Sequence, residues 1–164
     1  MVRARREAFI ISDEIAGEAS KIRYSYEVPV KIYFSCSIRG VRPDHETPQL
    51  LIDHLKGYGR VLTEHIGNVT EEFEAGISEV EIFERDVAWL KEADVIVAEV
   101  TGPSLGVGYE IGIAETLGKP ILCLYKDTGK KISAMILGNH GITVKGYNDP
   151  SEACQHIDEF LSQS

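Results

Sequence analysis

Residues 95–112 read Val95-Ile-Val-Ala-Glu-Val-Thr-Gly-Pro-Ser-Leu-Gly-Val-Gly-Tyr-Glu-Ile-Gly112. The mostly apolar run from Val95 to Val100 predicts a buried strand. A glycine-rich loop follows, and the chain then continues with helical spacing past Glu110. This order of strand, loop and helix is typical of parallel α/β sheets, in which the helix N-terminus offers free N–H groups to a phosphate. The stretch therefore predicts an α/β fold that places a carboxylate beside an anion site.

Other short apolar runs alternate with segments of helical period on both sides of this stretch. Such alternation predicts a parallel sheet that helices cover on both faces. A chain of 164 residues is long enough for one domain with its own core. We predict a single doubly wound α/β domain of the flavodoxin or Rossmann type, with a five-stranded parallel sheet. Its strands are expected at Val28 to Phe34, Val61 to Leu62, Val95 to Val100, Ile121 to Tyr125 and Ile142 to Val144.

The first 27 residues do not share this pattern. Arg3, Arg5 and Arg6 stand at the N-terminus, but no apolar segment with a cleavage site follows them, and acidic residues arrive early, so neither a secretion signal nor a transit peptide is expected. We interpret residues 1–27 as an N-terminal extension that is mobile or loosely docked, with a helix over Glu7 to Lys21 as the alternative. Residues 28–164 are expected to form the functional domain.

The cysteines and the hydropathy indicate where the protein resides. Cys36, Cys123 and Cys154 are odd in number and far apart, so neither a disulfide framework nor a zinc-binding pair is expected. No run approaches the roughly 20 apolar residues of a membrane span. We predict a protein of a reducing compartment, the cytoplasm, with the nucleus as a second location.

The formal net charge of −9 disfavours a nucleic-acid polymer as partner, because neutralising many phosphates requires a basic face. A bound anion is therefore expected to be small and locally held. The five histidines show no spacing typical of metal ligands. We expect neither a metal nor an organic cofactor.

Three loop segments are candidates for holding such an anion. In the first, Tyr33 to Gly40, the planar guanidinium of Arg39 suits a phosphate, and Ser37 and Gly40 allow close backbone approach. The second is Gly102 to Gly108, before the predicted helix, and the third is Gly129 to Met135, in which Ser133 can cap a short helix. Each segment alone is also compatible with an ordinary connecting loop.

Glu110 is the first candidate for a catalytic carboxylate. We place it about two residues into a helix that Gly108 opens, where the helix dipole would keep the carboxylate ionised. An ionised, oriented carboxylate is what covalent catalysis at a sugar carbon requires. The alternative is an acidic residue of the kind that any helix start favours.

Asp86 is the second candidate, on a helix predicted over Ser78 to Glu92. Helical spacing gives this segment an apolar stripe, and Asp86 lies beside it with Ile82 and Trp89. Partly buried surroundings would favour the protonated form, which could act as an acid. A salt bridge to Arg39 or Arg85 would have the opposite effect. The predicted stripe consists of Val80, Phe83, Val87 and Leu90.

Ser104 offers a weaker, different interpretation. Gly-Pro-Ser-Leu-Gly fits the Gly-x-Ser-x-Gly pattern of serine hydrolases. The only later partners for such a serine in convincing strand-end loops would be Asp127 and His140, and the chain is short for that fold. We regard a serine hydrolase as a minor alternative.

The combination of motifs resembles the 2′-deoxynucleoside 5′-monophosphate N-glycosidases, a branch related to the nucleoside 2-deoxyribosyltransferases. The resemblance runs in unbroken order over roughly residues 31–160, and the combination is specific where each piece alone is not. The motifs are Tyr33-Phe with Ser37-Ile-Arg-Gly40, Val61-Leu-Thr-Glu-His65, Asp86 with Trp89-Leu90, Ala93-Asp-Val95, Val97-Ala-Glu-Val-Thr101, Pro103-Ser-Leu-Gly-Val-Gly-Tyr-Glu110, Gly118-Lys-Pro-Ile-Leu-Cys-Leu124 and Ser133-Ala-Met-Ile136.

The resemblance implies a role for each matching residue. Glu110 corresponds to the nucleophile that attacks the deoxyribose anomeric carbon, Asp86 to the acid that assists departure of the base, and Tyr33 to a tyrosine that supports catalysis. Ser133 corresponds to a serine that reaches the phosphate of the neighbouring subunit, which implies a homodimer. The implied contacts to the nucleotide, mostly to its 5′-phosphate, are Ser37, Ile38, Arg39, Gly40, Ser104 and Gly106.

Three features depart from the family pattern. Cys36 and Val41 stand where the family usually has glycines on either side of the Ser-Ile-Arg-Gly motif. Both add a side chain near the phosphate loop, so phosphate affinity or base preference is expected to differ. The N-terminal extension has no counterpart in the resemblance.

The chemistry agrees with the resemblance, because a retaining pair uses one carboxylate as nucleophile and a second group as acid. We expect a nucleotide N-glycosidase domain that hydrolyses 2′-deoxynucleoside 5′-monophosphates to free base and 2-deoxyribose 5-phosphate, through a covalent ester on Glu110. A nucleoside 2-deoxyribosyltransferase would form the same ester and pass the sugar to a second base. A non-catalytic nucleotide-binding module is the other alternative.

Overall fold

The computed structural model describes residues 29–38, 46–68 and 76–163. Its five strands form one all-parallel sheet in the order β2-β1-β3-β4-β5. The predicted α/β class and the five-stranded parallel sheet are confirmed. The strands are β1 (Val30–Cys36), β2 (Gly59–Val61), β3 (Val95–Glu99), β4 (Ile121–Lys126) and β5 (Thr143–Tyr147).

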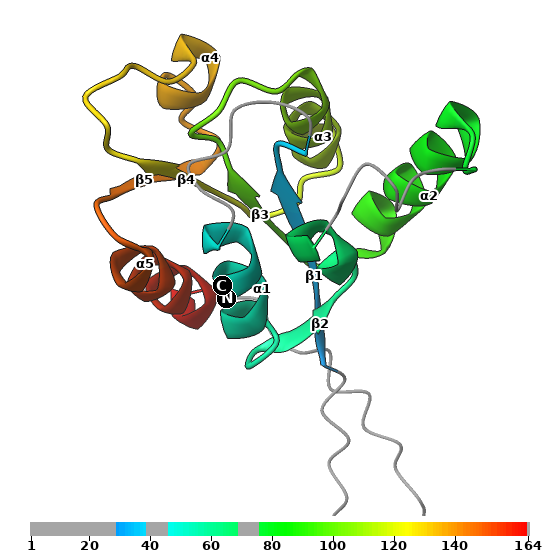
Figure 1. Ribbon diagram of the computed structural model, residues 1–164, viewed down its shortest axis with the longest axis horizontal. Helices are drawn as coiled ribbons and strands as arrows, with labels where there is room; N and C mark the ends of the chain where they lie inside the picture. The colour runs from blue at the N-terminus through cyan, green and yellow to red at the C-terminus, as the bar shows by residue number, and fades with distance from the viewer. Residues whose placement is uncertain (1–28, 39–45, 69–75, 164) are drawn as a thin grey trace, which may run out of the picture.

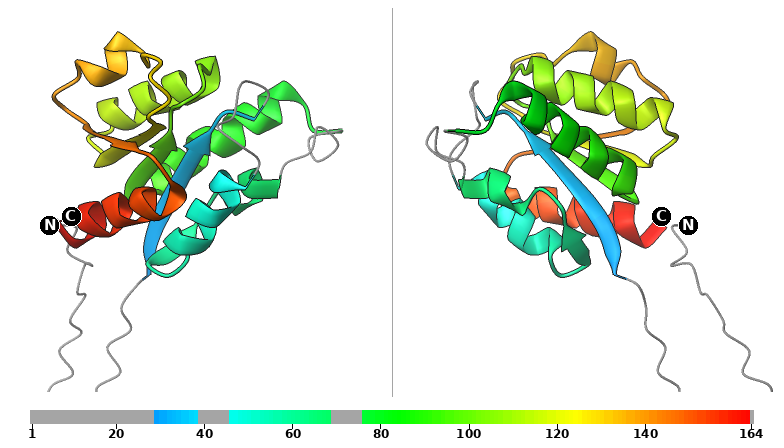
Figure 2. Two further views of the ribbon diagram at one scale, coloured as in Figure 1. Left: turned by 60° about the vertical axis from the view of Figure 1, so that its left-hand side comes forward. Right: turned by 90° about the vertical axis from the view of Figure 1, so that its right-hand side faces the viewer.

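Helices cover both faces of this sheet (Figure 1, Figure 2). Because side chains alternate along a strand, Ile32 and Phe34 pack against one layer, and Tyr33 packs against the other. The first layer holds α1 (Thr47–Leu55) and α5 (Pro150–Gln163), and the second holds α2 (Glu79–Glu92) and α3 (Leu105–Thr116). The remaining elements are the 3₁₀ helix η1 (Glu64–Asn68) and the short α4 (Ala134–Leu137).

The strand order creates a crevice at one edge of the sheet. From β1 the chain crosses through α1 to β2 on one side, whereas β3 pairs with the opposite side of β1. The connections after β1 and β3 therefore diverge, and open α/β sheets bind ligands outside the carboxyl ends of strands at such a point. The first two of the three candidate anion loops follow these two strands.

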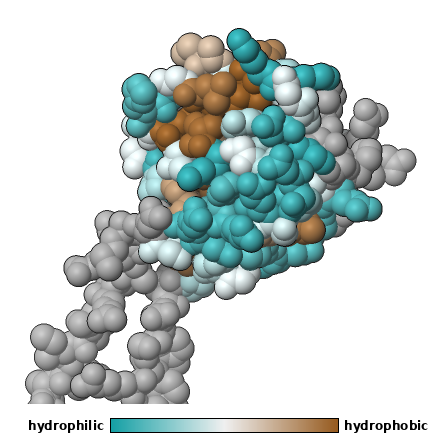
Figure 3. Space-filling model, turned by 90° about the vertical axis from the view of Figure 1, so that its left-hand side faces the viewer, coloured by the Kyte–Doolittle hydropathy of each residue, from teal (hydrophilic) through white to brown (hydrophobic). Residues whose placement is uncertain are grey.

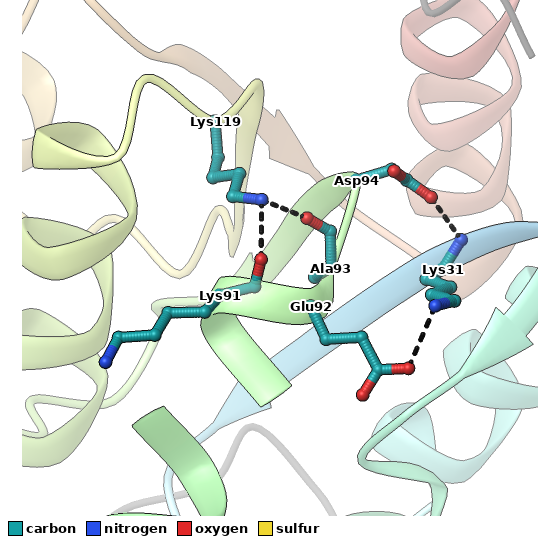
Figure 4. A network of polar contacts seen from close by, with 6 residues as sticks. All are labelled: Lys31, Lys91, Glu92, Ala93, Asp94 and Lys119. Carbon is teal, nitrogen blue, oxygen red and sulfur yellow. Dashed lines mark hydrogen bonds and ion pairs between the residues drawn. The ribbon is translucent and has the colours of Figure 1, made fainter. Parts of the chain in front are cut away.

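Contacts at the amino edge of the sheet hold the end of α2 in place (Figure 4). Lys119 Nζ donates to the carbonyl oxygens of Lys91 and Ala93, at 2.9 and 2.5 Å, which satisfies acceptors that the helix end leaves open. Asp94 accepts from the backbone N–H of Lys31 at 2.9 Å, and Lys31 Nζ pairs with Glu92 at 3.0 Å. The helix that carries Asp86 is thus tied to β1 and to the turn before β4.

The other end of α2 begins as the sequence predicts, but its apolar stripe does not enter the core. Ser78 caps the helix by accepting from Glu81 N–H, and Glu81 accepts in return from Ser78 N–H. Leu90 is buried, whereas Val80 is 64% and Phe83 is 51% exposed. The predicted apolar stripe is therefore buried at its Leu90 end and exposed in the first half of the helix.

The predicted extension, residues 1–27, lies outside the described residues, so that division of the chain stays a prediction. Among the residues that the structure describes, no helix combines the length and the apolar character needed to cross a membrane. None of the three cysteines is in a disulfide.

Candidate active site

A cavity of about 700 Å³ opens at the carboxyl ends of β1 and β3, between α2 and α3. Its walls come from the end of β1, from η1, from one face of α2 and from the first half of α3. Six of the residues predicted from the sequence line this one cavity. They are Ser37, Ile38, Asp86, Ser104, Gly106 and Glu110.

A residue of β1 holds the side chain of Glu110 in place. The hydroxyl of Ser35 donates a hydrogen bond to Glu110 Oε2. Tyr33 lies two residues earlier, on the same face of the strand, and is fully buried. Its hydroxyl lies near the Glu110 carboxylate, but it makes no hydrogen bond with the described residues. The Ser35 hydroxyl thus holds the nucleophile candidate, and the Tyr33 hydroxyl lies close to it.

Burial shapes the charge state of this pair. It raises the pKa of the Glu110 carboxyl; the Ser35 hydroxyl opposes that rise, and the negative charge of Asp86 adds to it. Burial also raises the pKa of Tyr33 far above its usual range, and the charges of Glu110 and Asp86 raise it further. Tyr33 is therefore a neutral hydrogen-bond donor next to the buried side chain of Glu110.

The expectation that a helix dipole keeps Glu110 ionised is wrong. Ser104 is the N-cap of α3 and accepts from Val107 N–H at 3.4 Å, so the helix begins at Leu105. Glu110 is then the sixth residue of α3, beyond the first turn in which the dipole acts. The second candidate loop is likewise shorter than predicted, because Gly106 and Gly108 belong to the helix.

Asp86 faces the cavity from α2, with 77% of its side chain buried, as 23% is exposed. The predicted partly buried surroundings are confirmed. Of the two salt-bridge partners considered, Arg85 is the one found among the described residues, and its Nε donates to Asp86 Oδ1 at 2.8 Å. Both of the opposing influences considered from the sequence, partial burial and an ion pair, are therefore present at Asp86. The Arg85 guanidinium also lies over the ring of Trp89, at 4.9 Å from the ring centroid, and Trp89 contacts His65.

The end of the cavity at which the sequence predicts a phosphate is only partly described. Ser37 is buried and Ile38 half-buried at the end of β1, while Arg39, Gly40 and Val41 lie outside the described residues. Cys36 is buried and lines the cavity, as its replacement of a family glycine suggests.

Gly106 keeps space open in the same wall. A Cβ atom at this position would meet no atom closer than Ser104 Oγ at 3.8 Å. A side chain at this position would therefore meet no protein atom, but it would fill part of the cavity. The sequence Ser104-Leu105-Gly106 thus combines a helix cap with a surface that a ligand can approach closely.

Ser133 lies elsewhere. It caps α4 by accepting from Met135 N–H at 3.3 Å, as predicted. It lines a second hollow of about 560 Å³ on the other side of the Gly102–Leu105 segment. Within the described chain, Ser133 is therefore not among the residues that line the cavity with Glu110.

Sequence reasoning missed two buried polar residues, Ser35 beside Glu110 and Glu99 on the other face of the sheet. Ser35 is a polar residue inside an apolar run, two positions after Tyr33, and that spacing could have identified it as facing the same way. Glu99, at the end of β3, is buried and accepts from the Tyr147 hydroxyl at 3.1 Å. Among the described residues, no group of three or more His, Cys, Asp or Glu side chains could hold a metal ion.

Sequence similarity to known proteins identifies the family of the chain that forms this cavity. The nucleoside 2-deoxyribosyltransferase family matches residues 32–152. The 5-hydroxymethyl-dUMP N-hydrolase of Mus musculus is 52% identical over 115 residues, which are 68% of this chain and 66% of that protein. A Trichoplax adhaerens protein, provisionally named 2′-deoxynucleoside 5′-phosphate N-hydrolase 1, is 47% identical over 135 residues, 80% of this chain and 92% of its own.

Solved structures show the same fold at lower identity. A CMP N-glycosidase of Clostridium botulinum superposes with a TM-score of 0.61 at 23% identity, over 79% of this chain and 98% of that one. The resemblance predicted from the motifs is confirmed. The chain belongs to the nucleoside 2-deoxyribosyltransferase family.

Proposed function

We propose that the protein hydrolyses the N-glycosidic bond of 2′-deoxynucleoside 5′-monophosphates, with Glu110 as nucleophile and Asp86 as acid. The observation that carries this proposal is the placement of the two carboxylates in one cavity at the carboxyl ends of β1 and β3, one held by Ser35 and the other by Arg85. The enzyme class predicted from the sequence, an N-glycosidase, is confirmed by the names of the relatives.

The proposed reaction has two steps. Glu110 attacks C1′ of the sugar as the bond to the base breaks, and the electron pair of that bond leaves with the base, which takes the proton of Asp86. Water then gives a proton to the Asp86 carboxylate and attacks C1′ of the ester, which breaks the bond to Glu110 and releases 2-deoxyribose 5-phosphate. Tyr33, as a neutral donor beside Glu110, would stabilise the carboxylate by a hydrogen bond during both steps. Neither step calls for a metal or an organic cofactor, and that absence stays a prediction.

A phosphate end favours a nucleotide over a nucleoside. Ser37, Ser104 and the open backbone at Gly106 line the same cavity, and Arg39 and Gly40 follow directly in the chain. These groups suit a 5′-phosphate. A 2-deoxyribosyltransferase acting on unphosphorylated nucleosides would have no use for them, and a non-catalytic binding module would not require a buried nucleophile.

Base release from a panel of nucleotides tests the proposal. The purified protein is incubated with the four 2′-deoxynucleoside monophosphates, with 5-hydroxymethyl-dUMP, for which several relatives are named, and with the matching ribonucleotides. Chromatography should detect free base from deoxynucleotides only. Binding without base release would contradict hydrolysis and favour the binding module, whereas exchange of a free base into a nucleoside would favour the transferase.

The pH dependence of a Ser35→Ala variant probes how Glu110 is held. The hydrogen bond from Ser35 lowers the pKa of the Glu110 carboxyl, so its loss raises that pKa and leaves less carboxylate at low pH. We expect kcat/KM to fall about 10- to 100-fold on the acidic side of the profile and to recover as the pH rises. Ser162→Ala, which removes a hydroxyl from α5, is the matched control. An acidic limb that stays in place would contradict this role.

The proposal includes a homodimer in which Ser133 serves the site of the other subunit. Support comes from the surface around it, because Leu105 is 96% and Met135 81% exposed and both line the same hollow as Ser133. Figure 3 shows an apolar area on the face of the molecule that carries α4. Monomeric proteins seldom leave large apolar side chains together in water, so a second copy is the proposed cover.

Mixing two inactive variants tests this arrangement. Glu110→Gln chains keep Ser133, and Ser133→Ala chains keep Glu110. If Ser133 acts across the interface, a mixed dimer contains one intact site, and activity should rise toward a quarter of the wild-type value or more as subunits exchange. If Ser133 acts within its own chain, mixing restores nothing, and the proposed arrangement is wrong.

The proposal also covers the division of the chain and its location. Residues 28–164 would form the N-glycosidase domain, with residues 1–27 as an extension. Three cysteines without a disulfide suit the cytoplasm, and the nucleus is the second proposed location.

A further inference from the structure

Arg85 is a cation that two contacts hold at the wall of the cavity. Its side chain is only 24% exposed, its Nε donates to Asp86 Oδ1, and its guanidinium stacks over Trp89. Trp89 in turn packs against His65, with ring centroids 5.5 Å apart. An arginine that is ion-paired on one edge and stacked on one face has little freedom to turn. Its position in the cavity is therefore fixed before a ligand binds.

The charge of Arg85 is unusual for this cavity. Among the described residues that line it, Arg85 is the only arginine or lysine, while three carboxylates line it: Glu79, Asp86 and Glu110. Its positive charge reaches the catalytic centre, because it opposes part of the rise in the pKa of Tyr33. A cation in this place can stabilise negative charge that develops during a reaction.

Most of the hydrogen-bonding capacity of Arg85 is uncommitted. A guanidinium has five N–H donors. The hydrogen bonds among the described residues use only Nε, which leaves the terminal amino groups without a partner there. Asp86 is similar, since Arg85 contacts Oδ1 and no hydrogen bond to Oδ2 is found within the described residues. Donors and a carboxylate oxygen thus lie side by side at the cavity wall.

We propose that Arg85 recognises the base and stabilises it as it leaves, by donating from its terminal amino groups to a carbonyl oxygen next to the glycosidic nitrogen. The inference rests on the proposed function, and it applies to nucleotides whose base carries a carbonyl oxygen next to the glycosidic nitrogen, as does the uracil ring in the names of several relatives. When the bond from C1′ to N1 breaks, its electron pair spreads from N1 onto O2 of the pyrimidine. The terminal amino groups of Arg85 donate to O2 and offset that charge, while Oδ2 of Asp86 gives its proton to N1, so that the base departs as a neutral molecule. Adenine has no carbonyl oxygen to accept these hydrogen bonds.

A comparison of leaving groups separates this role from a structural one. The variants are Arg85→Met, Arg85→Lys and the control Lys91→Met, which removes an exposed cation from the same helix. The substrates are dUMP, 5-fluoro-dUMP, whose base is the better anionic leaving group, and dAMP. We expect Arg85→Met to lower kcat/KM for dUMP about 10²-fold, mainly in kcat, and to affect dAMP much less. The ratio of 5-fluoro-dUMP to dUMP should rise severalfold.

Arg85→Lys keeps a cation and should return that ratio toward the wild-type value, while Lys91→Met should leave all rates unchanged. Equal losses for all three substrates in Arg85→Met would indicate a role limited to packing and would overturn the inference. A fall in the 5-fluoro ratio would do so as well.

A binding measurement keeps the inference testable without turnover. In chains that also carry Glu110→Gln, calorimetry with dUMP and dAMP should show about threefold weaker dUMP binding on replacement of Arg85 by Met, and nearly unchanged dAMP binding. Equal weakening of both ligands would overturn the inference. Failure of the proposed function appears differently, as nucleotide binding by the wild-type protein without release of any base.

Discussion

Glu110→Gln should lower kcat by about 10⁴-fold or more while nucleotide binding persists. The amide has nearly the shape of the carboxylate and can still accept the hydrogen bond from Ser35, but it is too weak a nucleophile to form an ester with C1′. Removal of a nucleophile that acts only in the chemical step lowers kcat without a matching change in affinity. Steady-state base release and calorimetry with the same nucleotide would measure the two quantities separately.

The matched control is Glu115→Gln, which changes an exposed glutamate of the same helix whose carboxylate accepts from Asn139. Its activity should stay within about twofold of wild type, because surface substitutions away from special features have small effects. Turnover that survives in Glu110→Gln would remove Glu110 from the mechanism. Loss of binding together with turnover would indicate instead that the carboxylate organises the cavity.

Asp86→Asn should be the second most damaging substitution, with a loss in kcat of about 10²- to 10⁴-fold, the usual range for a general acid. Asparagine keeps the size of the side chain, and its carbonyl oxygen can accept from Arg85 Nε, so the fold and the position of Arg85 should be preserved. The missing property is a proton to give to the departing base. Rates measured over a set of leaving groups should therefore become more sensitive to the acidity of the base.

Glu84→Gln serves as the control on the same helix, since Glu84 is exposed. A uniform loss in Asp86→Asn for good and poor leaving groups would contradict an acid role and favour a role in substrate positioning. Thermal unfolding of both variants should be close to wild type, which separates chemistry from folding.

The sequence predicted the sheet well because strands buried on both faces leave a strong apolar signal. The runs around Val95 and Ile121 have no competing interpretation, and the observed strands β3 and β4 begin at those residues. Boundaries that depend on caps were less accurate. Two glycines suggested a loop up to Gly108, whereas the side chain of Ser104 starts the helix at Leu105.

Periodicity also could not distinguish a core from a cavity wall. Val80 and Phe83 have the spacing of a buried stripe, yet they lie where α2 extends past the sheet, and Phe83 lines the cavity instead. The contact that holds Glu110 was hidden for another reason. Ser35 and Glu110 are 75 residues apart in the sequence, and only the packing of α3 against β1 brings them together. The identities of both carboxylates, by contrast, followed from their motifs.

The strand order explains why these residues meet. Tyr33 and Ser35 on β1 point to the face that α2 and α3 cover, so the two helices bring Asp86 and Glu110 to the same end of one strand. Contacts of Lys31 and Lys119 at the far edge fix α2 without blocking the cavity. The fold thus separates the residues that give rigidity from those that face a ligand.

The stereochemistry of a methanol-trapped product tests the central claim, the covalent ester on Glu110, most directly. The enzyme is incubated with a 2′-deoxynucleotide substrate in dilute methanol, and proton NMR identifies the methyl 2-deoxyriboside 5-phosphate that forms. Two successive displacements at C1′ predict retention, so the product should be the β-methyl glycoside, matching the configuration of the nucleotide. An α-methyl glycoside would show a single displacement by solvent and would contradict the nucleophilic role of Glu110.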